Sequence, residues 1–377
     1  MTPYLGASIS SHTLRNILIG QFHPIVLSGS KPGLRDECRV IERYDPRIIQ
    51  RLVTNISMTK ARSSLISIDA TPYYHCVSRC VRRSFLCGYD ALAKQSYEHR
   101  RGWIEERLLA LAGAFCIDVC AYAIMSNHYH VVLHIDVNKA KRLTQYEVVE
   151  RWLAFHQGPS LIQRFVQGDE LSEVEVERCS DIIEAWRERL TSISWFMRLL
   201  NQHIASQANR EDKCTGHFWE SRFKSQALLD EKALAAAMAY VDLNPVRAAI
   251  AETPEASEHT SVKARIASLR KEQSTAPHLF PFAGNPREPM PEGLPFRLMD
   301  YLELVDWTGR QSREDKRGKI DGRTPEILNR LGFDSTEWLD TYARIEKGTL
   351  IGTEPAIKEA LPSLGRKRLC GFRLPTH

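Results

Sequence analysis

The sequence predicts an α+β fold, and three observations support this expectation. Two segments, 73–81 and 216–229, read as half-buried strands, and the first alternates apolar and polar residues clearly. Residues 117–124 and 128–135 form a pair of apolar segments around a Met-Ser-Asn sequence that suits a hairpin turn. Three longer segments repeat apolar residues at helical spacing and are expected to be helices: 91–114, 181–209 and 231–243.

In chain order these elements read strand, helix, strand, strand, helix, strand, helix. The first six have the β-α-β-β-α-β order of the ferredoxin-like fold, so we expect a sheet with helices on one face. Asp230 is a good N-cap for the alanine-rich helix 231–243. This helix should end at Asn244, because proline at 245 disfavours helical conformation in the residue before it.

The main domain is expected at 67–250, because the periodicity is clear only there. Met58 begins a stretch that resembles a normal start, so residues 1–57 are either a loosely ordered extension or a consequence of start-site choice. The other expected segments are an N-terminal extension at 1–66, an insertion at about 138–180, a linker at 251–297 and a helical C-terminal extension at 298–377.

Composition excludes several classes of protein. No apolar run approaches the roughly 20 residues that cross a bilayer, and no secretory signal is recognisable, so a cytoplasmic protein is expected. The nine cysteines are an odd number and scattered, which favours reduced thiols over a disulfide framework. Cys76, Cys80 and Cys87 form a cluster that raises a structural zinc site as an alternative, but no second CxxC-like pair follows at finger spacing.

The charge pattern permits a nucleic-acid partner. The net charge is +5 and the pI is about 8.7. Basic residues follow the first strand, and others stand beside aromatic residues in the segment 216–229, a combination that suits DNA. A half-buried strand with a solvated face would look the same. The candidate DNA contacts here are Arg79, Arg82, Arg83, Trp219, Arg222 and Lys224.

His128-Tyr129-His130 is the most informative short motif. Successive side chains of a strand point to opposite faces, so His128 and His130 share a face, with Cα atoms roughly 7 Å apart. Two imidazoles at this spacing can converge on one metal ion, although two ordinary strand histidines have the same pattern. His134 lies roughly 13 Å of strand beyond His130. We therefore expect it to be a core or DNA-facing residue rather than a ligand.

Tyr240 and Asn244 stand four residues apart, a spacing that places both on one helix face. The Asn244 amide oxygen could complete a three-ligand metal site with His128 and His130, which would polarise a phosphoryl oxygen. A tyrosine hydroxyl can attack a phosphodiester, giving a phosphotyrosine and a free 3′-OH, and the retained bond energy allows rejoining without ATP. Packing for Tyr240 and helix capping for Asn244 are the simpler alternatives.

Four motifs in order resemble those of single-tyrosine HUH transposases, and most closely the REP-associated tyrosine transposase branch. They are Tyr-His-Cys-Val-Ser-Arg, Ala-Tyr-Ala-Ile-Met-Ser-Asn-His-Tyr-His-Val-Val-Leu, Gly-His-Phe-Trp-Glu-Ser-Arg-Phe-Lys and Tyr-Val-Asp-Leu-Asn-Pro-Val-Arg-Ala. The resemblance covers about 70–250. The insertion at 138–180 and the chain after 250 are not part of the compact family core.

The resemblance implies a role for each matching position. His128 and His130 would bind the metal, Mg²⁺ or Mn²⁺ in the family, and Tyr240 would become joined to the 5′ end of cleaved single-stranded DNA. Asn244 would complete the metal site, where many relatives carry Gln. Arg222 and Lys224 would contact phosphate, and Arg247 joins the expected DNA-binding residues.

The expected function is therefore cleavage and rejoining of single-stranded, hairpin-forming DNA by a transposase-like enzyme. One alternative is a non-catalytic DNA- or RNA-binding protein on the same fold. A second is a metal-dependent nuclease that uses water, in which Tyr240→Phe would stay active. The sequence leaves open whether the protein is a monomer or a homodimer.

Overall fold

The structure is a computed structural model, and it describes residues 65–81, 86–90, 94–271, 273, 276–284, 292–312, 323–365 and 371–375. Residues 60–377 form one compact unit, to which all described residues belong. Met58, Arg82 and Arg83 lie outside the described residues. In the described part of the chain, no helix combines the length and apolar character that a bilayer crossing requires.

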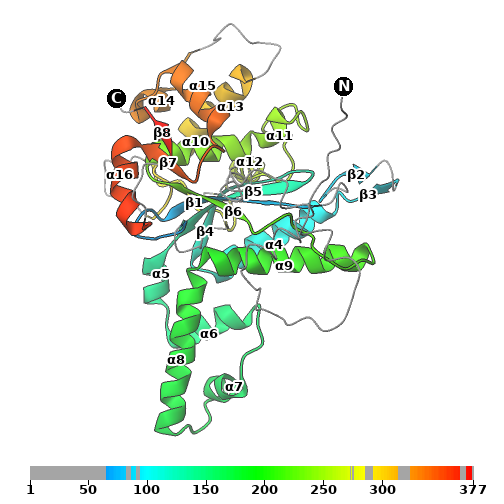
Figure 1. Cartoon of the computed structure of the whole chain (residues 1–377), viewed down its shortest axis with the longest axis vertical. Coiled ribbons are helices and arrows are strands. Elements are labelled where there is room, and N and C mark those ends of the chain that lie inside the picture. The colour runs from blue at the N-terminus through cyan, green and yellow to red at the C-terminus, as the bar shows by residue number, and fades with distance from the viewer. Residues whose placement is uncertain are drawn as a thin grey trace, which may run out of the picture. The chain divides into compact units, whose positions relative to one another are not determined.

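The centre of this unit is a six-stranded sheet in the order β4-β5-β1-β6-β7-β8 (Figure 1). The first four strands pair antiparallel, whereas β7 and β8 add to the β6 edge in parallel. The expected α+β class is confirmed, and β7 and β8 were not foreseen. The strands are β1 (Tyr73–Arg79), β4 (Ile117–Ile124), β5 (His128–Ile135), β6 (Lys224–Leu228), β7 (Leu350–Thr353) and β8 (Phe372–Leu374), with a separate ladder of β2 (Tyr89–Asp90) and β3 (Gln95–Ser96).

One face of the sheet is covered by α4 (Arg100–Ala114) and α9 (Ile193–Glu211), shown below the sheet in Figure 1. The rings of Phe115 and Phe196 meet edge-on at 5.5 Å between these helices and the sheet. The helix expected at 91–114 begins only at Arg100, because the short β2–β3 ladder occupies the residues before it.

The expected insertion is helical and extends away from α9 in Figure 1. The single helix predicted over 181–209 is wrong, because the chain breaks between α8 and α9. Ser192 has an extended conformation there (φ −90°, ψ 110°), and the Leu190 carbonyl accepts a hydrogen bond from the amide of Cys116 at 2.9 Å. The helices of this segment are α5 (Val137–Arg142), α6 (Gln145–Leu153), α7 (Ser160–Gln167) and α8 (Glu173–Leu190).

The opposite face of the sheet is covered too, so the expectation of helices on one face only is wrong. Both sides of β5 are apolar: Val131 and Leu133 are buried with α4 and α9, whereas Val132 is buried with α10. A sheet that is apolar on both faces needs cover on both. The helices above the sheet in Figure 1 include α10 (Glu231–Asp242), α11 (Asn244–Arg247), α13 (Leu298–Gln311), α14 (Glu326–Leu331) and α15 (Ser335–Arg344).

The segment 251–297, expected to be a linker, contains α12 (Ser261–Arg270), which packs against β4. Ser261 accepts a hydrogen bond from the amide of Tyr122 at 2.9 Å, and Thr260 forms an isolated bridge with Ala123. This segment therefore supplies buried residues to the fold. The C-terminal extension is helical as expected, but it also contains β7, β8 and α16 (Glu354–Ser363).

No disulfide joins two of the described cysteines, and all of these except Cys214 are buried. Burial raises the pKa of the Cys87 thiol to about 12. Among the described residues, no group of three or more His, Cys, Asp or Glu side chains is placed to hold a metal ion. The Cys76, Cys80 and Cys87 cluster thus does not form a zinc site in the described structure.

Candidate active site

The register of the sheet places the predicted basic and metal-binding side chains on one face. His128 of β5 lies opposite Arg79 of β1. Val77 of β1 lies opposite His130 of β5 on one side and opposite Lys224 of β6 on the other. Residues directly opposite in an antiparallel ladder point to the same side of the sheet. Arg79 and Lys224 are both exposed, so they border the histidine pair from neighbouring strands.

Helix α10 carries Tyr240 over this face, and the turn that follows carries Asn244. Asp230 caps the start of α10, accepting a hydrogen bond from the Ala233 amide at 2.9 Å. The Tyr240 and His130 rings are 5.7 Å apart, and Asn244 Nδ2 is 3.3 Å from His130 Nε2. The spacing of four residues therefore brings both side chains to His130.

A third histidine, which the sequence analysis did not assign, lies behind His130. His75 Nε2 is 3.0 Å from His130 Nδ1, and the two rings stack at 5.2 Å. His75 Nδ1 is in turn 3.1 Å from Oε1 of Gln226. Both histidines are almost fully buried, and burial lowers the pKa of each, so both rings are neutral.

The hydrogen bonds that link Gln226, His75 and His130 fix where each ring proton lies. The Gln226 amide nitrogen donates to two backbone carbonyls in 345–348, both at 2.9 Å, so its oxygen faces His75. An amide oxygen only accepts, so His75 carries its proton on Nδ1 and accepts at Nε2. His130 must then donate from Nδ1. Its Nε2 is then unprotonated, and its lone pair accepts from the Asn244 amide nitrogen at 3.3 Å.

His128 is half-buried at the open side of the site. Its Nδ1 is 2.6 Å from the side-chain oxygen of Asn127, so the proton lies on Nδ1 and Nε2 has a lone pair. Burial, and then the nearby charge of Arg79, lowers the pKa of His128 to about 4. Both histidines of the motif therefore present neutral Nε2 atoms, the form that binds metals.

The hydroxyl of Tyr240 is held by two charged side chains. Arg247 donates a hydrogen bond to it, with the guanidinium 4.2 Å from the ring centroid. Burial raises the pKa of Tyr240 above its usual value, Arg247 lowers it, and a hydrogen bond with Glu346 raises it. The structure therefore places Arg247 on the Tyr240 hydroxyl, a contact that its assignment to DNA binding did not include.

Glu346 is a second residue that the sequence analysis missed. Its carboxylate is exposed and lies 3.7 Å from His130 Nε2, while Tyr342 on the same segment places its ring 5.9 Å from that of Tyr240. No motif surrounds Glu346, and it belongs to the C-terminal extension outside the expected domain. Its sequence environment offered no signal for this placement.

The donor set fits a divalent ion. His128 and His130 offer imidazole nitrogens, and rotation of the Asn244 amide would turn its oxygen toward the same point. Imidazole nitrogens suit softer first-row ions, so Mg²⁺ or Mn²⁺ at this point would take its remaining hard oxygen ligands from the substrate phosphate and water. The exposed Glu346 carboxylate adds a negative charge beside them.

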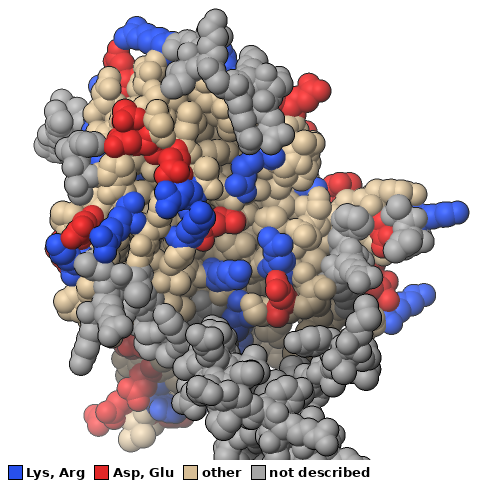
Figure 2. Space-filling model, turned by 45° about the horizontal axis from the view of Figure 1, so that its top comes forward, with Lys and Arg blue, Asp and Glu red and all other residues tan. Residues whose placement is uncertain are grey.

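The other predicted DNA contacts are dispersed. The strand expected at 216–229 is confirmed only from Lys224 onward, so Arg222 lies just before β6, where it is exposed. Trp219 lies on the opposite face of the sheet, where its indole donates to the Asn201 carbonyl at 2.9 Å and its ring meets Tyr129 at 5.7 Å. Figure 2 shows basic and acidic side chains close to one another on the face it presents.

His134 does not join the site. It bonds to Asp118 at 2.9 Å and stacks on the buried Phe280 at 4.5 Å, so of the two expected places, core or DNA-facing, these contacts favour the first.

Comparisons with known proteins add a single likeness. No protein-family model matches the chain, and no curated protein does. A solved structure of a REP-associated tyrosine transposase bound to a REP hairpin is similar with 10% sequence identity and a TM-score of 0.33, over 63% of this chain and 97% of that chain. A TM-score of this size does not establish a shared fold, so the function must be inferred from the site itself.

Proposed function

We propose that the protein cleaves and rejoins single-stranded, hairpin-forming DNA through a phosphotyrosine on Tyr240. The observation that carries this proposal is the convergence of Tyr240, Asn244, His128 and His130 on one face of the sheet. We also propose that β4-β5-β1-β6 with α4 and α9 is a ferredoxin-like nuclease unit of the HUH type, to which the parallel strands are an addition.

The chemistry assigned to Tyr240 is a transesterification. Its hydroxyl oxygen forms a bond to phosphorus, the bond from phosphorus to the 3′ oxygen breaks, and the leaving 3′ oxygen takes a proton from water to become the 3′-OH. The phenol proton passes to Glu346, which is hydrogen-bonded to the hydroxyl. Arg247 stabilises the negative charge that develops on the oxygen. Reversal of these steps rejoins the strand.

We assign a divalent metal, Mg²⁺ or Mn²⁺, to His128, His130 and Asn244. When bound, such an ion would polarise the scissile phosphate. His75 and Gln226 hold His130 with its Nε2 lone pair directed toward Asn244. Arg79 and Lys224 lie on neighbouring strands of the same face, and we assign them to contacts with the DNA backbone.

The test uses labelled single-stranded hairpin oligonucleotides from the flanks of the gene, with Mn²⁺ and a denaturing gel. The wild type should give a labelled band linked to protein, and Tyr240→Phe should lose it because the nucleophilic oxygen is gone. Tyr342→Phe is the matched control, since that ring lies 5.9 Å from Tyr240 and has no role in the proposed step.

The gel also separates the alternatives. Cleavage without a protein-linked band, retained in Tyr240→Phe, would indicate hydrolysis by water. Binding of the hairpins without cleavage would indicate a non-catalytic DNA-binding protein.

A further inference from the structure

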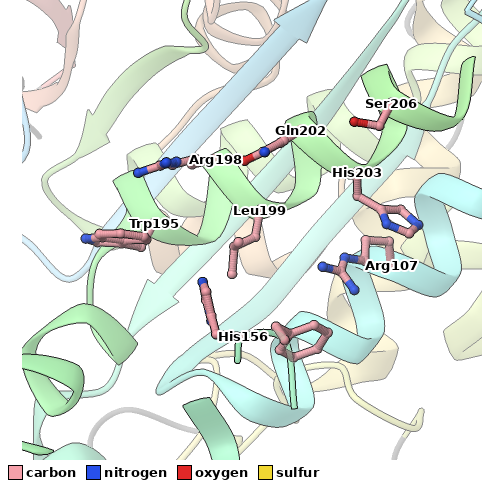
Figure 3. Close-up of a pocket in the computed structure, with 9 residues that line it drawn as sticks. Arg107, His156, Trp195, Arg198, Leu199, Gln202, His203 and Ser206 are labelled. Carbon is pink, nitrogen blue, oxygen red and sulfur yellow. The ribbon is translucent and has the colours of Figure 1, made fainter. Parts of the chain in front are cut away.

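A cavity of about 520 Å³ lies on the other face of the sheet, away from Tyr240 (Figure 3). Its lining comes from α4, from the residues after α6 and from successive turns of α9. The α9 side chains recur at intervals of three and four residues, so they form one helix face. The lining residues are Arg107, Phe155, His156, Trp195, Arg198, Leu199, Gln202, His203 and Ser206.

One wall of the cavity is aromatic. His156 stacks on Trp152, with ring centroids 4.0 Å apart, and both rings meet Trp195 edge-on, at 6.2 Å and 5.4 Å. Trp152 is in turn stacked against Trp186 of α8 at 5.8 Å. The wall is therefore fixed by the packing of the insertion helices against α9.

Arginine side chains surround this wall without carboxylate partners. Arg198 and Arg189 place their guanidinium groups 4.9 Å and 4.8 Å from the Trp195 ring centroid, and Arg107 lies 4.4 Å from that of Phe155. Among the residues that the structure describes, none of these three arginines forms an ion pair, and the cavity lining includes no Asp or Glu. Arg107 Nε is buried without a hydrogen-bond partner in the described structure.

This arrangement differs from that of nearby surface arginines. Arg164, Arg178 and Arg187, on α7 and α8, each pair with a carboxylate of their own segment. Arg198 is exposed to water, but the buried Arg107 Nε donor costs free energy unless water or a ligand accepts from it. A ligand that is anionic and also has a flat ring would meet this donor, the neighbouring guanidinium groups and the aromatic wall.

We propose that this cavity binds a nucleotide of single-stranded DNA, its phosphate held by Arg107 and Arg198 and its base against the aromatic wall. Gln202 and Ser206, exposed on the same face of α9, offer hydrogen bonds to either part. The volume is in the range of small-ligand sites. The choice of DNA rests on the proposed function, and the site would hold a part of the strand remote from the cleaved phosphate.

The test is fluorescence anisotropy of a labelled oligothymidylate of roughly 20 nucleotides, long enough to cover several contacts. EDTA is present, so the measurement reports binding alone. The double variant Arg107→Gln and Arg198→Gln should raise Kd roughly tenfold and should lower the salt slope by about 0.7, for the one phosphate that the two arginines hold. The control is Arg178→Gln with Arg310→Gln, which removes the same charge from exposed arginines paired within their own helices.

Equal affinity in the two double variants would overturn the proposal, as would wild-type protein that does not bind the oligothymidylate at about 50 mM salt. An oligonucleotide with 5-iodouracil should crosslink to Trp195 or Phe155, and crosslinks confined to the Tyr240 face would also overturn it. The outcome is separable from that of the proposed function. If the wild type gives the protein-linked band and the cavity variant binds with normal affinity, the proposed function holds and the cavity site does not. If the band is absent and the cavity variant binds more weakly, the cavity site holds and the proposed function does not.

Discussion

His75 acts at the scale of a single residue by fixing the proton of its neighbour. It accepts from His130 Nδ1 and donates to Gln226, so the free lone pair of His130 faces the proposed metal. The partner of the second ring nitrogen commonly sets the tautomer and orientation of a metal-binding histidine. His75 is thus a positioning residue that would touch neither metal nor DNA.

This role predicts a loss of metal affinity with partial rescue. His75→Leu should weaken Mn²⁺ binding by roughly 10- to 100-fold, because the His130 ring loses its acceptor. His75→Gln should retain much of the affinity, since a glutamine amide again offers an oxygen to His130 and an N–H to Gln226. Calorimetric titration with Mn²⁺ measures both, and His134→Leu on the same strand face should bind normally. Equal loss in the Leu and Gln variants would contradict the positioning role.

Sequence could predict the residues whose relation is local. His128 and His130 are two positions apart in a strand, and Tyr240 and Asn244 are four apart around a helix end. The side-chain periodicity of strands and helices is therefore enough to predict that each pair shares a face. His75, Gln226 and Glu346 meet them only through strand pairing and the return of the C-terminal segment. No local pattern encodes such contacts.

At the scale of elements, Asp230 joins α10 to the added strands. One carboxylate oxygen accepts from Ala233 at the helix start, and the other accepts from the Thr353 amide at 2.6 Å, just where β7 ends. The same side chain therefore caps the helix that carries Tyr240 and secures β7 beside β6.

Asp230→Ala should lower the free energy of unfolding by more than the loss of an ordinary helix cap does. Loss of a helix cap costs about 1 kcal/mol, and the unpaired Thr353 amide should add about 1 kcal/mol or more. Ser172→Ala, which removes the exposed capping residue of α8, is the matched comparison. Urea unfolding of both variants measures the difference. Equal destabilisation would mean that the bond to Thr353 contributes nothing.

Element boundaries depended on tertiary structure more than on local preference. The apolar pattern of 181–209 continues through Thr191 and Ser192, but the Leu190 carbonyl leaves the helix to bond Cys116. Residues 216–223 look like strand, yet they follow the sheet edge only through a bridge from Trp219 to Cys80. Short apolar segments do not reveal which partner they will meet.

At the scale of the whole molecule, one apolar core joins the C-terminal extension to the sheet. Trp338 of α15 is fully buried, and its indole donates to Thr308 at 2.9 Å, in the same cluster as α10 and Val132 of β5. The sequence suggested a separate unit after a linker. Composition reports how polar a segment is, but it does not report what that segment packs against.

Trp338→Ala should therefore destabilise the sheet as well as the extension. Removal of a fully buried Trp side chain costs roughly 3–5 kcal/mol. A single thermal transition should move to lower temperature, and hydrogen exchange of the β1 and β5 amides should accelerate with it. Val174→Ala, at an exposed position on α8, is the control. Two transitions, with only one shifted, would show that the extension folds independently.

The central place of β1 has a consequence for the order of assembly. This strand comes first, but one of its two partners, β6, is made much later, and His75 and Gln226 are 151 positions apart. Pairings across such separations form slowly, because the long loop must close before they give any stability. The Gln226 amide also needs carbonyls at 345 and 348. A chain still on the ribosome therefore holds its histidines long before anything orients them, and the proposed DNA-cutting centre becomes complete only after residues 345–348 have been made.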